Sequence, residues 1–144
     1  MALPDQIKWE APTSRTSGIS GATAATDAGT VGSEIDNETN LDQLCDIQLQ
    51  WSFATSPTAN KSLLLYLLRQ VDGTNYEDGS ASVQPSRNLV LAVSPPANTS
   101  THYAVAERVP IPPHPIKALL WNDGTGQTVT ATVTIKTYNH EQVE

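Results

Sequence analysis

The sequence predicts an all-β protein, an antiparallel β-sandwich of jelly-roll type with an extended N-terminal arm. Three observations predict this class. Residues 45–53 alternate apolar and polar side chains, residues 127–138 do the same, and turns rich in Gly and Pro separate several short apolar runs. Period two is typical of a strand with one face in a core, whereas a helix needs apolar residues at three- and four-residue spacing.

The composition limits the classes of partner. The 144 residues suit one domain, and the formal net charge is -7. A phosphate backbone or an anionic membrane surface requires a basic footprint, so we expect neither a nucleic-acid partner nor a membrane partner. The N-terminus has no basic segment followed by a long apolar run, so a secretory signal is not expected.

The chain divides into an arm at residues 1–31 and a sandwich domain at residues 32–144. Clear apolar alternation is absent from the arm, where residues 11–31 are rich in Ala, Thr, Ser and Gly. Such a stretch cannot bury enough apolar surface to order itself, so we expect an extended segment with a short strand at residues 7–9. Trp9 is costly to leave in water and is expected to dock on the domain or on a neighbour.

Short strands with turns between them make up the rest of the prediction. The candidates are residues 7–9, 32–37, 45–53, 63–71, 87–93, 101–109, 116–121 and 127–138. This number suits a jelly roll, although strand number alone does not decide the topology. In the last strand Val129, Ala131, Val133 and Ile135 are expected on the buried side, with threonines on the other.

The continuous apolar run at residues 63–68 needs a separate explanation. It fits a strand buried on both faces or one buried core helix. The strand is preferred because Asp72-Gly73 ends the run sharply. A neighbouring subunit is a further possible cover for this run.

Catalytic and metal motifs are missing from the sequence. The histidines are His102, His114 and His140, and no nucleophile elbow, phosphate-binding glycine loop or metal-ligand spacing accompanies them. We therefore expect no enzyme, no cofactor and no metal. The acidic loop at residues 72–79 is interpreted as turn chemistry in preference to a Ca²⁺ site. Cys45 is expected to be a buried, unreactive residue.

Carbohydrate binding is the main ligand alternative. The aromatic residues that could form a stacking platform are Trp9, Trp51, Trp121, Tyr66, Tyr76, Tyr103 and Tyr138. Trp51 belongs to the core-facing set of its strand, whereas Trp121 ends a strand beside a turn and is expected to be partly exposed. Ordinary packing is preferred for most of these rings.

The arm and a stiff connector favour a role in assembly. Pro110-Ile111-Pro112-Pro113-His114-Pro115 presets an extended conformation and lowers the entropy lost on docking. Arms that order against a partner can wrap large surfaces. The partner-binding candidates are Ile7, Trp9 and Ile19 in the arm and Pro112 and Pro113 in the connector.

The chain resembles small virion structural proteins of tailed bacteriophages. The resemblance rests on residues 65–79, a strand that runs into the turn DGTNYEDG, on the closing strand, and on the plan of a Ser/Thr-rich arm before a β-domain. It implies a decoration (cement) protein of the capsid, made in the host cytoplasm and found in the virion. Its expected partners are the major capsid protein or other virion proteins, and a homo-oligomer, with a trimer favoured, is implied. The alternative is a tail-associated host-recognition or carbohydrate-binding β-domain.

Overall fold

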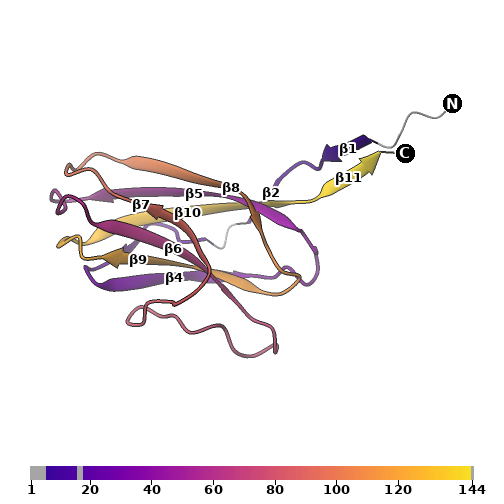
Figure 1. Cartoon of the computed structure of the whole chain (residues 1–144), viewed down its shortest axis with the longest axis horizontal. Coiled ribbons are helices and arrows are strands. Elements are labelled where there is room, and N and C mark those ends of the chain that lie inside the picture. Colours follow the sequence, from indigo (N-terminus) through magenta and orange to yellow (C-terminus); the bar gives the residue numbers. More distant parts are fainter. Residues whose placement is uncertain (1–5, 16–17, 144) are drawn as a thin grey trace.

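The computed structural model describes residues 6–15 and 18–143, of which residues 6–9, 14–15 and 141–143 are described by their backbone alone. These residues form eleven strands, and no helix occurs among them. One sheet, here the β5 sheet, contains β2 (Thr13–Arg15), β3 (Ala22–Ala24), β5 (Leu44–Phe53), β8 (His102–Pro110) and β10 (Val129–Tyr138). The other, the β6 sheet, contains β4 (Ala28–Ile35), β6 (Ser62–Arg69), β7 (Leu89–Val93) and β9 (Ile116–Asp123). Figure 1 shows the two sheets packed as the layers of a sandwich.

The strand order is that of a jelly roll. The β5 sheet runs β2-β10-β5-β8, with β3 also paired to β10, and the β6 sheet runs β4-β9-β6-β7. The antiparallel pairs β6/β7, β5/β8, β4/β9 and β3/β10 are therefore nested, as in one long hairpin rolled up around a core. The predicted antiparallel, jelly-roll-like sandwich is confirmed.

Alternation puts the core between the sheets. On β5 the five residues Cys45, Ile47, Leu49, Trp51 and Phe53 are all buried, as the period-two pattern predicts. β10 pairs with β5 in register along its whole length and turns its apolar set, including Val133 and Ile135, to the same side. Both strands leave their polar sets on the outer face of the sheet.

β6 is buried on both faces, as expected for its continuous apolar run. Leu63, Leu65 and Leu67 belong to the main core, while Tyr66 and Leu68 form a second cluster with Leu119 and Trp121 on the other side of the sheet. The chain itself supplies the cover, through the segment 70–88 that links β6 to β7 and passes beneath the sheet (Figure 1). The approach is close at Gly79, where a Cβ atom would lie 2.9 Å from Pro85 Cγ.

Residues 13–15 and 18–31 differ from the expected extended arm. β2 and β3 add to the edge of β10, β4 begins at Ala28, and the expected boundary after residue 31 falls inside β4. Gly18 permits the close approach, because a Cβ atom there would lie 1.7 Å from the Val133 carbonyl oxygen. Backbone pairing with an open sheet edge orders this segment, which is why its few apolar side chains did not reveal it.

The two ends of the described chain form a ribbon. β1 (Gln6–Trp9) pairs antiparallel with β11 (His140–Val143), from Gln6 opposite Val143 to Trp9 opposite His140. Figure 1 shows this ribbon leaving one end of the sandwich without a sheet beneath it. At its base the backbone N–H of Glu10 donates a 3.1 Å hydrogen bond to the carbonyl oxygen of Asn139.

Candidate functional site

The outer face of the β5 sheet is open and polar. It is made of side chains that point away from the core on three neighbouring strands, and we call it the open face: Tyr103 and Val105 on β8, Gln48 and Gln50 on β5, and Thr130, Thr132 and Thr134 on β10. Gln50 lies between Tyr103 and Thr132 in the register, and Gln48 lies between Val105 and Thr134. Six of these seven residues therefore form two rows that each cross three strands.

The exposed residues of β8 are the large ones. Tyr103 is 60% exposed and Val105 is 53% exposed, whereas the small residues Ala104 and Ala106 pack against the core. An aromatic ring and an aliphatic side chain in water cost hydration free energy. Their presence on a face otherwise made of amides and hydroxyls indicates a surface suited to a ligand with both apolar and hydroxylated parts.

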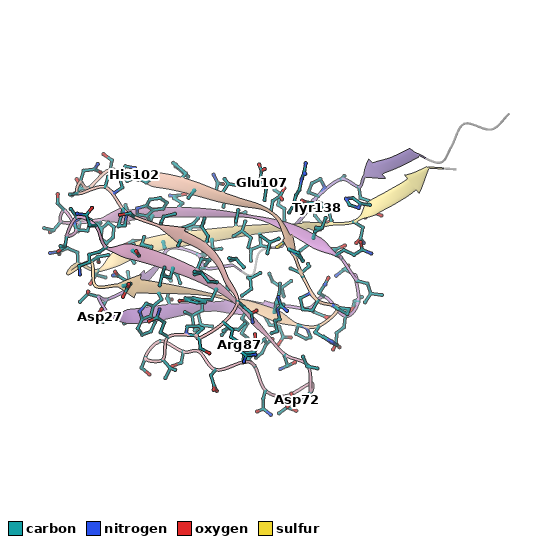
Figure 2. The ribbon with its side chains drawn as sticks, in the orientation of Figure 1. Asp27, Asp72, Arg87, His102, Glu107 and Tyr138 are labelled. Atoms are coloured by element: carbon teal, nitrogen blue, oxygen red, sulfur yellow. The ribbon has the colours of Figure 1, made fainter. Side chains whose placement is uncertain are left out.

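Two adjoining hollows extend the open face toward the base of the ribbon. One, of about 230 Å³, is lined by Gln48, Val105 and Thr134 together with Asp46, Ile47 and Lys136. The next, of about 270 Å³, is lined by Glu10, Pro12, Asp46, Glu107, Arg108 and Tyr138. Both hollows border Asp46 and therefore lie next to each other, and we call the two together the groove. Figure 2 shows Glu107 and Tyr138 toward the end of the sandwich from which the ribbon leaves, and His102 toward the other end.

Asp46 organises the end of this groove that Glu10 and Tyr138 line. Its Oδ1 accepts hydrogen bonds from the hydroxyl of Tyr138 at 2.8 Å and from the backbone N–H of Arg108 at 2.9 Å. Burial, and then the hydrogen bond to Asp46, raise the pKa of Tyr138 to about 12. The phenol therefore stays protonated and continues to donate at neutral pH. A local irregularity in the β5–β8 pairing accompanies the positive φ of 55° at Arg108.

Most of the aromatic side chains are packed, as preferred, and they do not form the stacking platform considered as the alternative. Trp121 was predicted to be partly exposed, but it is only 7% exposed and lies under the segment 70–88, in the second apolar cluster. Tyr76 is half-buried, with its hydroxyl bonded to Glu34 and the Lys117 Nζ 4.2 Å from its ring centre. Trp51 is in the core, as predicted. Of the aromatic side chains that the structure describes, the exposed one is Tyr103.

The predicted partner-binding residues lie in different surroundings. Ile7 and Trp9 are in β1, opposite Gln142 and His140, and their side chains fall outside the described ones. Ile19 is 2% exposed and packs in the main core.

The proline connector is anchored within the domain. Asn37 Nδ2 donates a 2.7 Å hydrogen bond to the carbonyl oxygen of Pro112, which is half-buried, while Pro113 is exposed. The backbone N–H of Gln70 donates to the carbonyl oxygen of Pro115. Of the five partner-binding candidates, Pro113 is the one whose described side chain is exposed.

The histidine and the acidic loop singled out in the sequence have definite contacts in the structure. His102 Nε2 lies 2.8 Å from Asn98 Oδ1, and its ring is 5.7 Å from that of Trp51, so its recorded contacts are an amide and an indole. Asp72 accepts the backbone N–H groups of Thr74 and Asn75, which lower its pKa and close a turn, as the turn interpretation predicts. Among residues 6–15 and 18–143 no group of three or more metal-ligating side chains comes together.

Cys45 is an inert core residue. Its side chain is buried, and burial raises the pKa of its thiol to about 12. A thiol so far from ionisation is a poor nucleophile at neutral pH.

In the described part of the chain no helix is long and apolar enough to span a membrane.

The known proteins that this chain is similar to are solved structures. No family model matches the sequence, and no curated protein matches it. Among solved structures, the chain is similar to the CBM36-1 domain of a xylanase from the hindgut metagenome of Trinervitermes trinervoides, with a TM-score of 0.45 and 8% identity over 93% of this chain and 96% of that one. It is also similar to a GH26-CBM35 mannanase of Podospora anserina, with a TM-score of 0.44 and 12% identity over 97% of this chain and 28% of that one. A Kashmir bee virus empty particle matches with a TM-score of 0.37 and 10% identity over 100% and 95%.

Proposed function

We propose that this protein is a non-enzymatic binding domain that recognises carbohydrate on the open face of its β5 sheet. The observation that carries the proposal is the exposed ring of Tyr103 directly opposite Gln50, with Thr132 completing the row. A sugar ring presents C–H groups on its faces and hydroxyls at its rim. An aromatic ring suits the first, and amide and hydroxyl side chains suit the second.

The shape of the groove favours a chain of sugars over a single one. The open face and its two hollows run from Tyr103 past Gln48 to the wall formed by Glu10 and Pro12. A shallow, solvent-open groove buries little of each sugar, so affinity has to be summed over several rings. We expect a Kd of about 0.1–1 mM for a single domain, which corresponds to about 4–5.5 kcal/mol.

A glycan array followed by titration calorimetry tests the proposal. The wild-type chain should bind at least one class of oligosaccharide, and Tyr103→Ala should lower its affinity about tenfold. Val71→Ala is the matched control, because Val71 is 75% exposed and lies in the segment 70–88. The proposal fails if no glycan binds, or if binding is the same in both variants.

A second candidate function is attachment to a virion as a decoration protein, and the terminal ribbon favours it. An isolated two-stranded ribbon is only marginally stable in water, so the pairing of β1 with β11 would be stabilised by packing against the surface of a partner. Under this proposal the partner is the major capsid protein or another virion protein, the protein is located in the virion, and it acts as a homo-oligomer, with a trimer favoured. Such binding stabilises the assembled shell by mass action.

Binding to expanded empty capsids separates the two functions. A variant that lacks residues 1–9 removes β1 and leaves β2, β3 and the core residue Ile19 in place. It should lose capsid binding if the ribbon is the anchor, whereas Tyr103→Ala should keep it. Capsid binding by the truncated protein at wild-type affinity would rule out the ribbon as anchor.

A further inference from the structure

Arg69 lies on the core-facing side of its strand. It continues the alternation of Leu63, Leu65 and Leu67, whose side chains all point between the two sheets. Its backbone is opposite Ile116 on β9, the first residue after the proline connector. Arg69 therefore occupies a core-facing position of β6, and the earlier core-facing residues of this strand are leucines.

The Nε of Arg69 is buried and has no hydrogen-bond acceptor among the described residues. A buried donor on a charged group is expensive to leave without an acceptor, which is why native structures seldom contain one. The nearby carboxylate of Glu77 is engaged elsewhere, since it accepts the backbone N–H of Arg69 and the side-chain amide of Asn88. The hydrogen-bonding capacity of the Arg69 guanidinium is thus not fully used within the described chain.

A hollow of about 390 Å³, lined in part by Arg69, lies at the open edge where β7 and β8 meet. Its lining combines the charged residues Arg69, Arg108 and Glu107 with Asn88 and an apolar wall of Leu89, Val90, Val109 and Pro110. Two arginines against one glutamate give the lining a positive excess, in a chain whose net charge is -7. Leu89 is 50% exposed, although it begins a strand.

We propose that this hollow binds a carboxylate attached to an apolar group. The carboxylate would pair with the part of the Arg69 guanidinium that lines the hollow, because a guanidinium matches the planar geometry of a carboxylate. The apolar group would cover Leu89 and Val90, which are left open at the sheet edge. Two sources share this chemistry: the C-terminus of a partner polypeptide and a small aliphatic acid. The site lies on other residues than the open face and goes beyond the proposed carbohydrate binding.

Nuclear magnetic resonance titration of the full chain tests the site. The probes are hexanoate, its neutral analogue hexanamide, the acetylated tripeptide Ac-Ala-Val-Leu with a free carboxylate, and the same tripeptide as its C-terminal amide. Both carboxylates should shift the Arg69 Nε–H signal and the backbone signals of Leu89 and Val90. Both amides should bind at least about tenfold more weakly.

Arg69→Lys keeps the charge and removes the planar guanidinium, so it should weaken carboxylate binding about fivefold or more. Arg87→Lys is the matched control, because Arg87 lies in the segment 70–88 and not in the lining of this hollow (Figure 2). Leu89→Ser, at a position that is 50% exposed, should weaken the binding of hexanoate as well. It serves as the second variant if Arg69→Lys fails to fold.

Each outcome either supports the proposed site or overturns it. Tighter binding of the tripeptide indicates a partner C-terminus, and tighter binding of hexanoate indicates a free acid; both support the site. Equal responses to hexanoate and hexanamide would overturn the proposal, as would binding unchanged by Leu89→Ser or by a folded Arg69→Lys. The absence of any shift up to about 20 mM, a concentration that detects even millimolar affinity, would also overturn it.

Discussion

Tyr103 on β8 lies directly opposite Gln50 on β5, on the side of the sheet that faces away from the core. The phenol ring is largely in water, and the amide beside it is exposed as well. This pair gives the proposed carbohydrate-binding face both an aromatic ring for stacking and a hydrogen-bonding amide, on two adjacent strands of the jelly roll.

The contribution of the ring can be separated from that of the hydroxyl. We expect Tyr103→Phe to keep most of the affinity for an oligosaccharide and Tyr103→Ala to lose about tenfold, since the ring face supplies the contact. Both variants should change the free energy of unfolding by less than about 0.5 kcal/mol, because the position is exposed. Calorimetric titration and urea unfolding measure the two quantities. Equal affinity of the Phe and Ala variants would contradict stacking.

Asn37 fixes the proline connector to the domain. It is buried, its Nδ2 donates to the carbonyl oxygens of Asp42 and Pro112, and its Oδ1 accepts the backbone N–H of Asp42. Asn37→Ala leaves these buried groups unpaired and should lower the free energy of unfolding by about 2–4 kcal/mol. Urea unfolding measures the loss. Asn75→Ala, in an exposed turn, is the control and should cost less than about 1 kcal/mol.

Gly18 is required for a steric reason. A Cβ atom at this position would lie 1.7 Å from the Val133 carbonyl oxygen, which is far inside van der Waals distance. The Val133 backbone N–H also donates a hydrogen bond to the carbonyl oxygen of the neighbouring Ile19, which holds the two segments together. Gly18→Ala should cost more than about 3 kcal/mol, because the first strands have to separate from β10. Gly21→Ala has open space around it and a φ of +57°, so strain alone should cost about 1–2 kcal/mol. Thermal unfolding compares them, and equal losses would contradict the steric reason.

Stability should fall in alkaline solution. In the folded state the pKa of Tyr138 and that of Cys45 are both raised to about 12, mainly by burial, above their ordinary values of about 10 and 8.5. The unfolded chain therefore loses these protons first. The stabilisation they provide is complete below pH ~8.5 and is lost as the pH rises toward 12.

Removing one of these groups should flatten that pH dependence. Tyr138→Phe loses the hydrogen bond to Asp46, so it should be less stable than the wild type at pH 7. Because it has no phenol to ionise, its free energy of unfolding should fall less than that of the wild type between about pH 9 and 11. Tyr103→Phe is the control, as Tyr103 is exposed. Chemical unfolding over the pH range gives the slopes. Identical slopes for Tyr138→Phe and the wild type would contradict the assignment to Tyr138.

The strands were the predictable part of the fold. The alternation at residues 45–53 and 127–138 gave the two central strands of the β5 sheet and their buried faces, because period two in the sequence is the period of the strand. The edge strands β2 and β3 were missed. They are short and are held by backbone pairing to β10, which leaves no side-chain pattern to detect.

The candidate site could not be predicted in the same way. On β8 the alternation of Tyr103 and Val105 with Ala104 and Ala106 suggests that the large residues face inward, and the structure has the opposite arrangement. The reason is the local packing beside β7, where the alanines are the residues that fit against the core. Trp121 shows the converse, since its cover comes from the segment 70–88, distant in the sequence.

By itself, the sequence determined that this is an all-β sandwich with Cys45 and Trp51 inside and an acidic, turn-rich surface, because those properties depend on local period and composition. Only the tertiary structure decided which faces remain open. Burial on the second side of a strand depends on segments that come from elsewhere in the chain. For that reason Tyr103 is in water, Trp121 is covered, and Arg69 has a donor between two sheets without an acceptor.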